Sequence, residues 1–181
     1  MTKPKRLPPW HERFQQEDGR EWLIRPVRPE DVGPLRGAYA LLGPDEVRRR
    51  FLHLDDGELT EQAAQRLCQP DPRSEFVLVA AEDQVPGEAL VGALARAAVI
   101  PRSRDAEYAI LISRFIAGQG VGRKLLQRVV KWARTKKLDY LYGDVSESNT
   151  AMLQLALSFG FRHDHAGSSP GLLRVVLDLN E

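Results

Sequence analysis

Three glycines, Gly118, Gly120 and Gly122, alternate with other residues directly before a helical pattern, in the stretch AGQGVGRKLLQRVV (117–130). Glycine permits a positive φ and close approach of the backbone, so successive N–H groups can point into one concavity. A helix that begins there adds its own unpaired N–H groups and the positive end of its dipole. We therefore expect this turn to bind an anion, most naturally a phosphate or a pyrophosphate.

The first turn of this helix carries two basic residues, Arg123 and Lys124, which oppose the helix dipole. Their presence is easier to explain if an anion shares the space. Two better-known phosphate motifs do not fit: the P-loop requires Lys and then Ser or Thr after its last glycine, and the Rossmann turn requires GxGxxG where this chain has GxGxG. The later basic residues of the helix, up to Lys137, are better explained as a solvated face.

Composition argues against several classes of function. The 181 residues carry a formal net charge of +1, which does not favour a general nucleic-acid binder. The sequence has one cysteine, Cys68, so neither an intramolecular disulfide nor a cysteine-based metal cluster can form. The N-terminal stretch MTKPKRLPPW lacks the apolar run of a signal peptide, and no 18-residue apolar segment follows it. We expect a cytoplasmic protein without a membrane partner.

The hydrophobic pattern predicts one mixed α/β domain (α+β) over residues 21–181, preceded by an N-terminal tail over residues 1–20. The nearly continuous apolar run AEYAILIS (106–113) indicates a strand buried on both faces, as in the centre of a layered sheet. Strands are also expected over 21–27, 74–82, 89–99 and 139–146 and in a final hairpin, and helices over 29–42, 44–54, 60–68, 149–160 and from the glycines to about residue 137.

Taken together, these segments resemble a known family. The string AEYAILISRFIAGQGVGRKLLQRVVKWA (106–133) is similar to the acyl-CoA-binding motif of GNAT-type N-acetyltransferases, which is a strand, a turn of pattern Q/R-x-x-G-x-G/A and a helix. YGDVSESNTAMLQLALSFGF (142–161) resembles the family's later strand and its helix from Asn to Gly-Phe, and IRPVRPEDVGPL (24–35) resembles its opening strand and helix. DEVRRRFLH (45–53) resembles a segment of bacterial protein lysine acetyltransferases of the Pat type.

The resemblance implies a GNAT-like domain with a mixed central sheet of about six to seven strands, flanked by helices. Two central strands would splay apart and hold acetyl-CoA, the cosubstrate, between them. Backbone groups of Leu111, Ile112 and Ser113 would line the pantetheine and the thioester, and Asn149 would lie near the pantetheine arm. The pyrophosphate would be held by the amides of the glycine turn, which are those of Ala117, Gly118, Gln119, Gly120, Val121, Gly122 and Arg123.

The sequence departs from the family pattern at two positions. Ala117 stands where the turn has Gln or Arg, so a side-chain contribution is missing and we expect weaker acyl-CoA binding. Ala156 stands where many GNAT enzymes have a tyrosine that protonates the leaving thiolate. Thiols have a reference pKa of about 8.5 and leave readily, so water could take over that role. Pat-type domains also commonly lack this tyrosine.

A general base is also implied by the resemblance. In Pat-type enzymes the proposed base is a glutamate of the buried strand, which matches Glu107 here. A carboxylate that enters a buried strand loses water and takes up a proton more readily, as a base at neutral pH requires. Alternatively, Glu107 faces solvent at the start of its strand. Asp144 and Glu147 are rivals on the next strand, although the first is also explained as a polar residue of the cleft and the second as part of a turn.

Two weaker patterns remain. RRRF (48–51) could meet an acidic acceptor protein, or it could be a solvated helix face with Phe51 in the core. His163 and His165 alternate on an expected strand, but two histidines without a nearby third ligand are weak support for a metal, and we predict no metal site.

Two functions from different classes fit these patterns. The first is an acyl-CoA-dependent N-acetyltransferase that moves an acetyl group to a primary amine by direct attack, with a strand amide at Leu111 or Ile112 polarising the thioester carbonyl. The expected acceptor is a protein lysine, and a small-molecule amine is the alternative. The second is a non-catalytic acyl-CoA-binding regulatory module, which the alanines at positions 117 and 156 favour. Glu107 in its expected place favours the enzyme.

Overall fold

The computed structural model describes residues 7–51, 58–85 and 87–181. Apolar residues at helical or alternating spacing mark most of its elements, as expected for a layered fold. The elements follow one another as β1 (Glu12–Gln15), β2 (Glu21–Pro26), the 3-10 helix η1 (Pro29–Asp31), α1 (Val32–Tyr39), β3 (Leu42–Gly43), α2 (Asp45–Arg50), α3 (Glu61–Leu67), β4 (Glu75–Glu82), β5 (Val91–Val99), β6 (Asp105–Ser113), α4 (Val121–Thr135), β7 (Tyr140–Ser146), α5 (Thr150–Ser158), β8 (Arg162–Ser169) and β9 (Leu172–Asp178).

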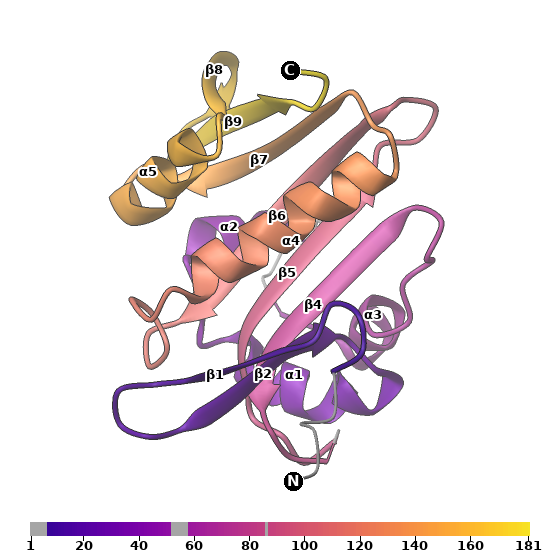
Figure 1. Ribbon diagram of the computed structural model, residues 1–181, viewed down its shortest axis with the longest axis vertical. Coiled ribbons are helices and arrows are strands. Elements are labelled where there is room, and N and C mark those ends of the chain that lie inside the picture. The colour runs from indigo at the N-terminus through magenta and orange to yellow at the C-terminus, as the bar shows by residue number, and fades with distance from the viewer. Residues whose placement is uncertain (1–6, 52–57, 86) are drawn as a thin grey trace, which may run out of the picture.

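These strands form one nine-stranded sheet in the order β1-β2-β4-β5-β6-β7-β9-β8, with β3 paired to β6 off this path. The helix α4 crosses one face of the sheet, and α1, α2 and α3 lie behind it (Figure 1). One apolar core joins the sheet to α4 and α5, and a second joins its other face to α1, α2 and α3. The predicted mixed α/β domain is therefore confirmed, and the sheet is wider than predicted because it includes the short strands β1 and β3.

The neighbours β6 and β7 run parallel and are paired only from Asp105–Tyr140 to Tyr108–Gly143, although both strands continue beyond this point. Gly143, at the last of these pairs, leaves room for the ring of Tyr108, because a Cβ there would lie 2.5 Å from that ring. Further along β6, Ile112 and Ser113 pair with β3. The segment 109–111 of β6 therefore lacks a strand partner on the β7 side among the described residues.

The first predicted helix differs most from the observed structure. Residues 29–42 were expected to form one helix, but the chain makes a 3-10 turn and then α1, which ends at Tyr39. Pro34 lies in the first turn of α1, where the N–H group that proline lacks has no helical partner to lose. The predicted helix over 44–54 is observed as α2 up to Arg50, and its residues 52–54 lie outside the described part of the chain.

The N-terminal segment corrects another expectation, because residues 12–15, assigned to a tail, form β1 and pair with β2. Its Glu12 carboxylate accepts a hydrogen bond from Lys124 Nζ at 2.8 Å and another from Arg128, both on α4. Gln16 follows the strand and donates to the carbonyl oxygen of Phe115 at 2.7 Å, just before the glycine turn. The N-terminal hairpin thus supports α4 and the loop that precedes it.

We predict that Glu12→Gln lowers the free energy of unfolding by about 0.5–1 kcal/mol at pH 7, the size of a partly exposed ion pair. Burial raises the pKa of Glu12, but hydrogen bonds and charge from Lys124 and Arg128 outweigh this and hold it below its ordinary value of 4.5. A carboxyl with a depressed pKa contributes stability above the unfolded value and loses it as the pH falls through the folded value. Urea denaturation should show the difference shrinking below pH 4.5.

Glu17, exposed in the turn of the same hairpin, supplies the matched control. Glu17→Gln should leave the stability nearly unchanged at both pH values. An equal effect of the two substitutions would contradict the assigned ion pair.

Candidate functional site

The glycine turn has the backbone geometry that the sequence predicted. Gly118 and Gly120 both adopt φ of +79°, and Gly120 is the N-cap of α4. A Cβ at either glycine would meet nothing within 4 Å, so both face open space. At Gly122 a Cβ would lie 3.3 Å from Ile112 and from Met152, which makes this glycine a close contact between α4, β6 and α5.

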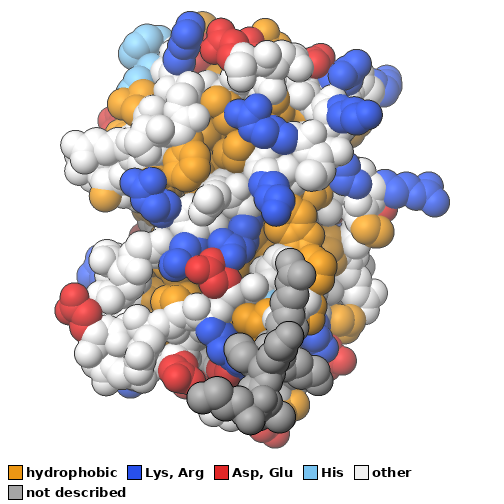
Figure 2. Space-filling view, in the orientation of Figure 1, with side chains coloured by type: hydrophobic (Ala, Val, Ile, Leu, Met, Phe, Trp, Pro, Cys, Tyr) orange, Lys and Arg blue, Asp and Glu red, His pale blue; other side chains and the backbone are white. Residues whose placement is uncertain are grey.

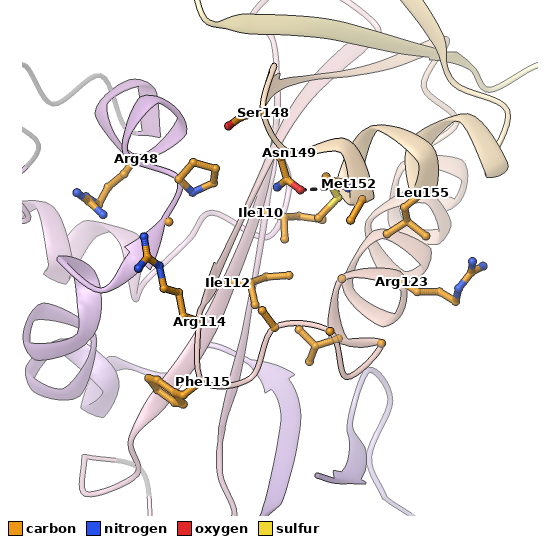
Figure 3. A pocket seen from close by; sticks show the side chains of 18 of the residues that line it. Arg48, Ile110, Ile112, Arg114, Phe115, Arg123, Ser148, Asn149, Met152 and Leu155 are labelled. Atoms are coloured by element: carbon orange, nitrogen blue, oxygen red, sulfur yellow. Dashed lines mark hydrogen bonds between the residues drawn. The ribbon is translucent and has the colours of Figure 1, made fainter. Parts of the chain in front are cut away.

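These glycines line a large cleft of about 1050 Å³. Asn149, Met152 and Leu155 of α5 lie on one side of it and Ile110 and Ile112 of β6 form its floor, while Arg123 projects from the start of α4 (Figure 3). Arg48 and Arg114 lie across the cleft from α5 (Figure 3). Lys and Arg side chains also gather over the face that carries α4 (Figure 2). The cleft therefore combines apolar walls, basic side chains and a helix N-terminus.

Most residues that the family resemblance assigned to the acyl-CoA site meet at this cleft. Three do not line it: Leu111 and Ser113 are buried toward the opposite face of the sheet, and Gln119 lies outside the lining. Those that line it are Ile112, Ala117, Gly118, Gly120, Val121, Gly122, Arg123 and Asn149.

The basic first turn of α4 has a different explanation from the one expected. Lys124 forms an ion pair with Glu12, a carboxylate of the same chain that also pairs with Arg128. Arg123 lines the cleft, with its guanidinium carbon 5.8 Å from the centre of the Phe159 ring. Of the two predicted cations, Arg123 is the one left beside the glycine turn.

Asn149 is held in place by the start of α5. It is the N-cap, and its side-chain oxygen accepts a hydrogen bond from the backbone N–H of Met152 at 3.2 Å. The two N–H donors of the Asn149 side-chain amide are not used in this hydrogen bond. Ile110, Met152 and Leu155 were missed as cleft residues, although strand parity with Ile112 and helical spacing from Asn149 mark them.

Glu107 lies in a second, smaller cavity of about 60 Å³ on the α2 face of the sheet. It is half-buried and accepts a hydrogen bond from the Tyr142 hydroxyl at 3.4 Å. Burial and the charge of Glu107 raise the pKa of Tyr142, so its phenol stays protonated and remains a donor. The carboxylate of Glu107 is thus reachable from a cavity and holds a single weak hydrogen bond among those identified.

The rival Asp144 lies in the same cavity but is held in ion pairs. Arg174 donates to its two oxygens at 3.1 Å and 3.3 Å, and Arg50 lies 3.6 Å away. The hydrogen bond to Asp144 is the main cause that raises the pKa of Arg174. The Asp144 carboxylate is thus occupied by two guanidinium groups, which leaves it less accessible to an amine than that of Glu107. Glu147, the other rival, is exposed in the turn after β7.

The other residues singled out in the sequence lie away from this chemistry or bond within the chain. In the RRRF segment, Arg48 donates to the Leu42 carbonyl at 2.6 Å and Arg50 donates to the Ser169 hydroxyl at 2.9 Å. Phe51 is buried, as the packing alternative expected. His163 and His165 stack on the exposed strand β8. Cys68 is buried, and burial raises the pKa of its thiol to about 12.

No helix within the described residues is long and apolar enough to cross a membrane. Likewise, those residues contain no group of three or more His, Cys, Asp or Glu side chains arranged to hold a metal ion.

Comparison with solved structures identifies proteins that share the fold of this chain. The GNAT domain of PAT from S. lividans superposes with a TM-score of 0.72 at 21% identity, covering 96% of this chain and 99% of that chain. The protein yncA from Salmonella typhimurium, solved with its cofactor acetyl-CoA, gives a TM-score of 0.64 at 20% identity and covers 88% of this chain and 95% of its own. At these identities the likeness concerns the fold alone.

Sequence comparison goes further. The chain is 30% identical over 150 residues to the acetyltransferase PA5475 of Pseudomonas aeruginosa. The aligned region covers 80% of this chain and 77% of the relative. The family model of the acetyltransferase (GNAT) domain matches residues 22–162, from the first residues of β2 to the start of β8. The chain therefore belongs to the GNAT family of acetyltransferases.

Proposed function

We propose that this protein transfers an acetyl group from acetyl-CoA to a primary amine, with a protein lysine as acceptor and Glu107 as the general base. One observation carries the proposal: the positive-φ glycine turn and the N-terminus of α4 open into the large cleft, beside the gap between β6 and β7. A backbone anion site joined to an apolar cleft suits a ligand with a pyrophosphate at one end and an apolar arm at the other.

In this proposal the amides from Ala117 to Arg123 bind the pyrophosphate of acetyl-CoA. Ile110, Ile112 and Met152 contact the pantetheine arm, and Asn149 donates to it. The segment 109–111 of β6, which lacks a strand partner on the side of β7, offers backbone groups to the thioester. We place the amide that polarises the carbonyl at Leu111, because Ile112 and Ser113 are paired with β3.

The chemistry requires a neutral amine. A lysine amine has a reference pKa near 10.4, so deprotonation at pH 7 costs about 4.6 kcal/mol. A carboxylate within reach of the amine accepts this proton, and such bases contribute about 10²–10⁴-fold to the rate. Glu107 fits this role better than Asp144, since it is half-buried beside a cavity and is not bound by an arginine in the identified ion pairs.

The small size of the Glu107 cavity supports a slender acceptor group. At about 60 Å³ it suits the end of an unbranched aliphatic amine, such as a lysine side chain, better than a bulky ring system. A small linear amine would fit equally well and is the alternative acceptor. The second function, a regulatory module that binds acyl-CoA without turnover, is supported by Ala117 and Ala156 and opposed by the position of Glu107.

The glycine turn supplies a direct test of binding. We predict that Gly120→Ala weakens acetyl-CoA binding by about 5- to 30-fold, because an L residue at φ of +79° costs about 1–2 kcal/mol or forces the amide away. Gly37→Ala is the control, since this glycine lies exposed in α1 and a Cβ there meets nothing within 4 Å. It should leave the affinity unchanged. Calorimetric titration with acetyl-CoA measures both, and an unaltered affinity in Gly120→Ala would argue against the turn as the pyrophosphate site.

The base is tested by turnover. We expect Glu107→Gln to bind acetyl-CoA like the wild type and to lose about 10²–10⁴-fold in kcat, because the proton acceptor is removed without a change in shape. Release of the CoA thiol is followed over a panel of lysine peptides, proteins and small amines. Glu147→Gln, which removes an exposed carboxylate on the next turn, should retain full activity.

The remaining outcomes separate the alternatives. Loss of activity in Asp144→Asn with an active Glu107→Gln would assign the base to Asp144. Binding of acetyl-CoA by the wild type without turnover on any acceptor would favour the regulatory module.

A further inference from the structure

A third, much smaller cavity of about 10 Å³, here called the connecting cavity, lies beside the two described above. It shares Pro44, Ile110, Asn149 and Met152 with the large cleft, and it shares Val47, Tyr108 and Asp144 with the Glu107 cavity. This connecting cavity lies where β6 and β7 stop pairing, since Tyr108 and Gly143 are the last paired residues. If the acyl donor enters from the large cleft and the amine from the Glu107 cavity, their reacting ends approach each other at this junction.

Tyr108 is the residue at this junction that has an unused polar group. Its side chain is buried, and its hydroxyl has no hydrogen-bond partner within the structure. Among the described residues that line the connecting cavity, it alone carries a buried side-chain polar atom without a partner. A buried hydroxyl without a partner costs about 1–3 kcal/mol, which a ligand atom could recover.

The ring of Tyr108 is fixed while its hydroxyl is left unpaired. The ring packs edge-on to Phe161 with centroids 5.7 Å apart and fills the space that a side chain at residue 143 would take. Burial, with a smaller contribution from the charge of Asp144, raises the pKa of Tyr108. The phenol therefore stays protonated at neutral pH and can act only as a hydrogen-bond donor toward an anion.

We propose that the Tyr108 hydroxyl is a further catalytic group, which donates a hydrogen bond to the sulfur of CoA as the thiolate forms. This inference rests on the proposed acetyl transfer. Ala156 supplies no hydroxyl at the position of α5 where many GNAT enzymes have a tyrosine. Tyr108 supplies one from β6 instead, and both residues belong to the core beneath α5.

The step is balanced without a further reactant. The amine nitrogen forms a bond to the thioester carbon, the carbon–sulfur bond breaks, and sulfur keeps the electron pair. One amine proton passes to Glu107. The thiolate is held by the hydrogen bond from Tyr108, which keeps its own proton, and takes a proton from solvent after release.

Tyr108→Phe tests this assignment. We expect kcat to fall about 10- to 100-fold, the size of a hydrogen bond to a charged group, while calorimetry gives an unchanged affinity for acetyl-CoA. The thermal midpoint should stay the same or rise, because the hydroxyl bonds to nothing within the structure. Tyr140→Phe, an exposed tyrosine on the neighbouring strand, is the control and should behave as the wild type.

A spectroscopic measurement separates a catalytic from a packing role. The ultraviolet absorbance of the thiolate reports the apparent pKa of the CoA thiol bound to the protein. We expect this pKa to lie below that of free CoA in the wild type and to be higher by about one unit or more in Tyr108→Phe. If Tyr108→Phe does not fold, the wild-type measurement alone decides, and an unshifted thiol would overturn the assignment.

These measurements also separate a failure of this inference from a failure of the proposed function. Absence of acetyl-CoA binding by the wild type would refute the proposed function itself. An active wild type with an equally active Tyr108→Phe, and an equal thiol pKa in both complexes, would overturn the role of Tyr108 alone.

Discussion

The parallel pairing between β6 and β7 is the constraint on which the rest of the structure depends. Four residue pairs join the two strands and then stop, whereas seven join β5 to β6 and seven join β7 to β9. Unpaired backbone groups in a sheet interior are costly, so a gap of this kind persists only where something else meets its edges. Here β3 pairs with the far end of β6, and the core beneath α5 closes the near end with the ring of Tyr108.

The charged side chains around the gap fall into two groups, those held in ion pairs and those that line the cavities. Asp144 and Glu12 are each bound to two basic side chains, which fixes these carboxylates as structural anions. Arg123 and Glu107 lie at opposite ends of the linked cavities. The charged groups outside these ion pairs, Arg123 and Glu107, therefore line the cavities in which a phosphate and an amine would bind in the proposed reaction. The ion pairs of Asp144 and Glu12 stabilise the surrounding structure.

Much of this arrangement could be predicted from the sequence. The glycine spacing indicated the turn, and periodicity alone gave the central strands, α4 and the final hairpin. The prediction failed where tertiary contacts decide local structure: β1 and β3 are too short for a periodic signal, and each exists because it pairs with β2 or β6. Lys124 was misread for the same reason, since its partner Glu12 is far away in the sequence. The orphaned hydroxyl of Tyr108 depends on three-dimensional packing that no spacing rule reports.

The stretch from β3 through α2 has a consequence for how two ligands affect each other. Gly43 and Arg48 line the large cleft, while Val47 and Arg50 line the Glu107 cavity. One short segment of backbone is thus a wall shared by two compartments, paired with β6 at one end and joined to Asp144 by an ion pair at the other. A ligand that displaced this wall in one compartment would change the volume of the other. The occupancies of the two compartments would then be thermodynamically linked, with the same coupling free energy in both directions.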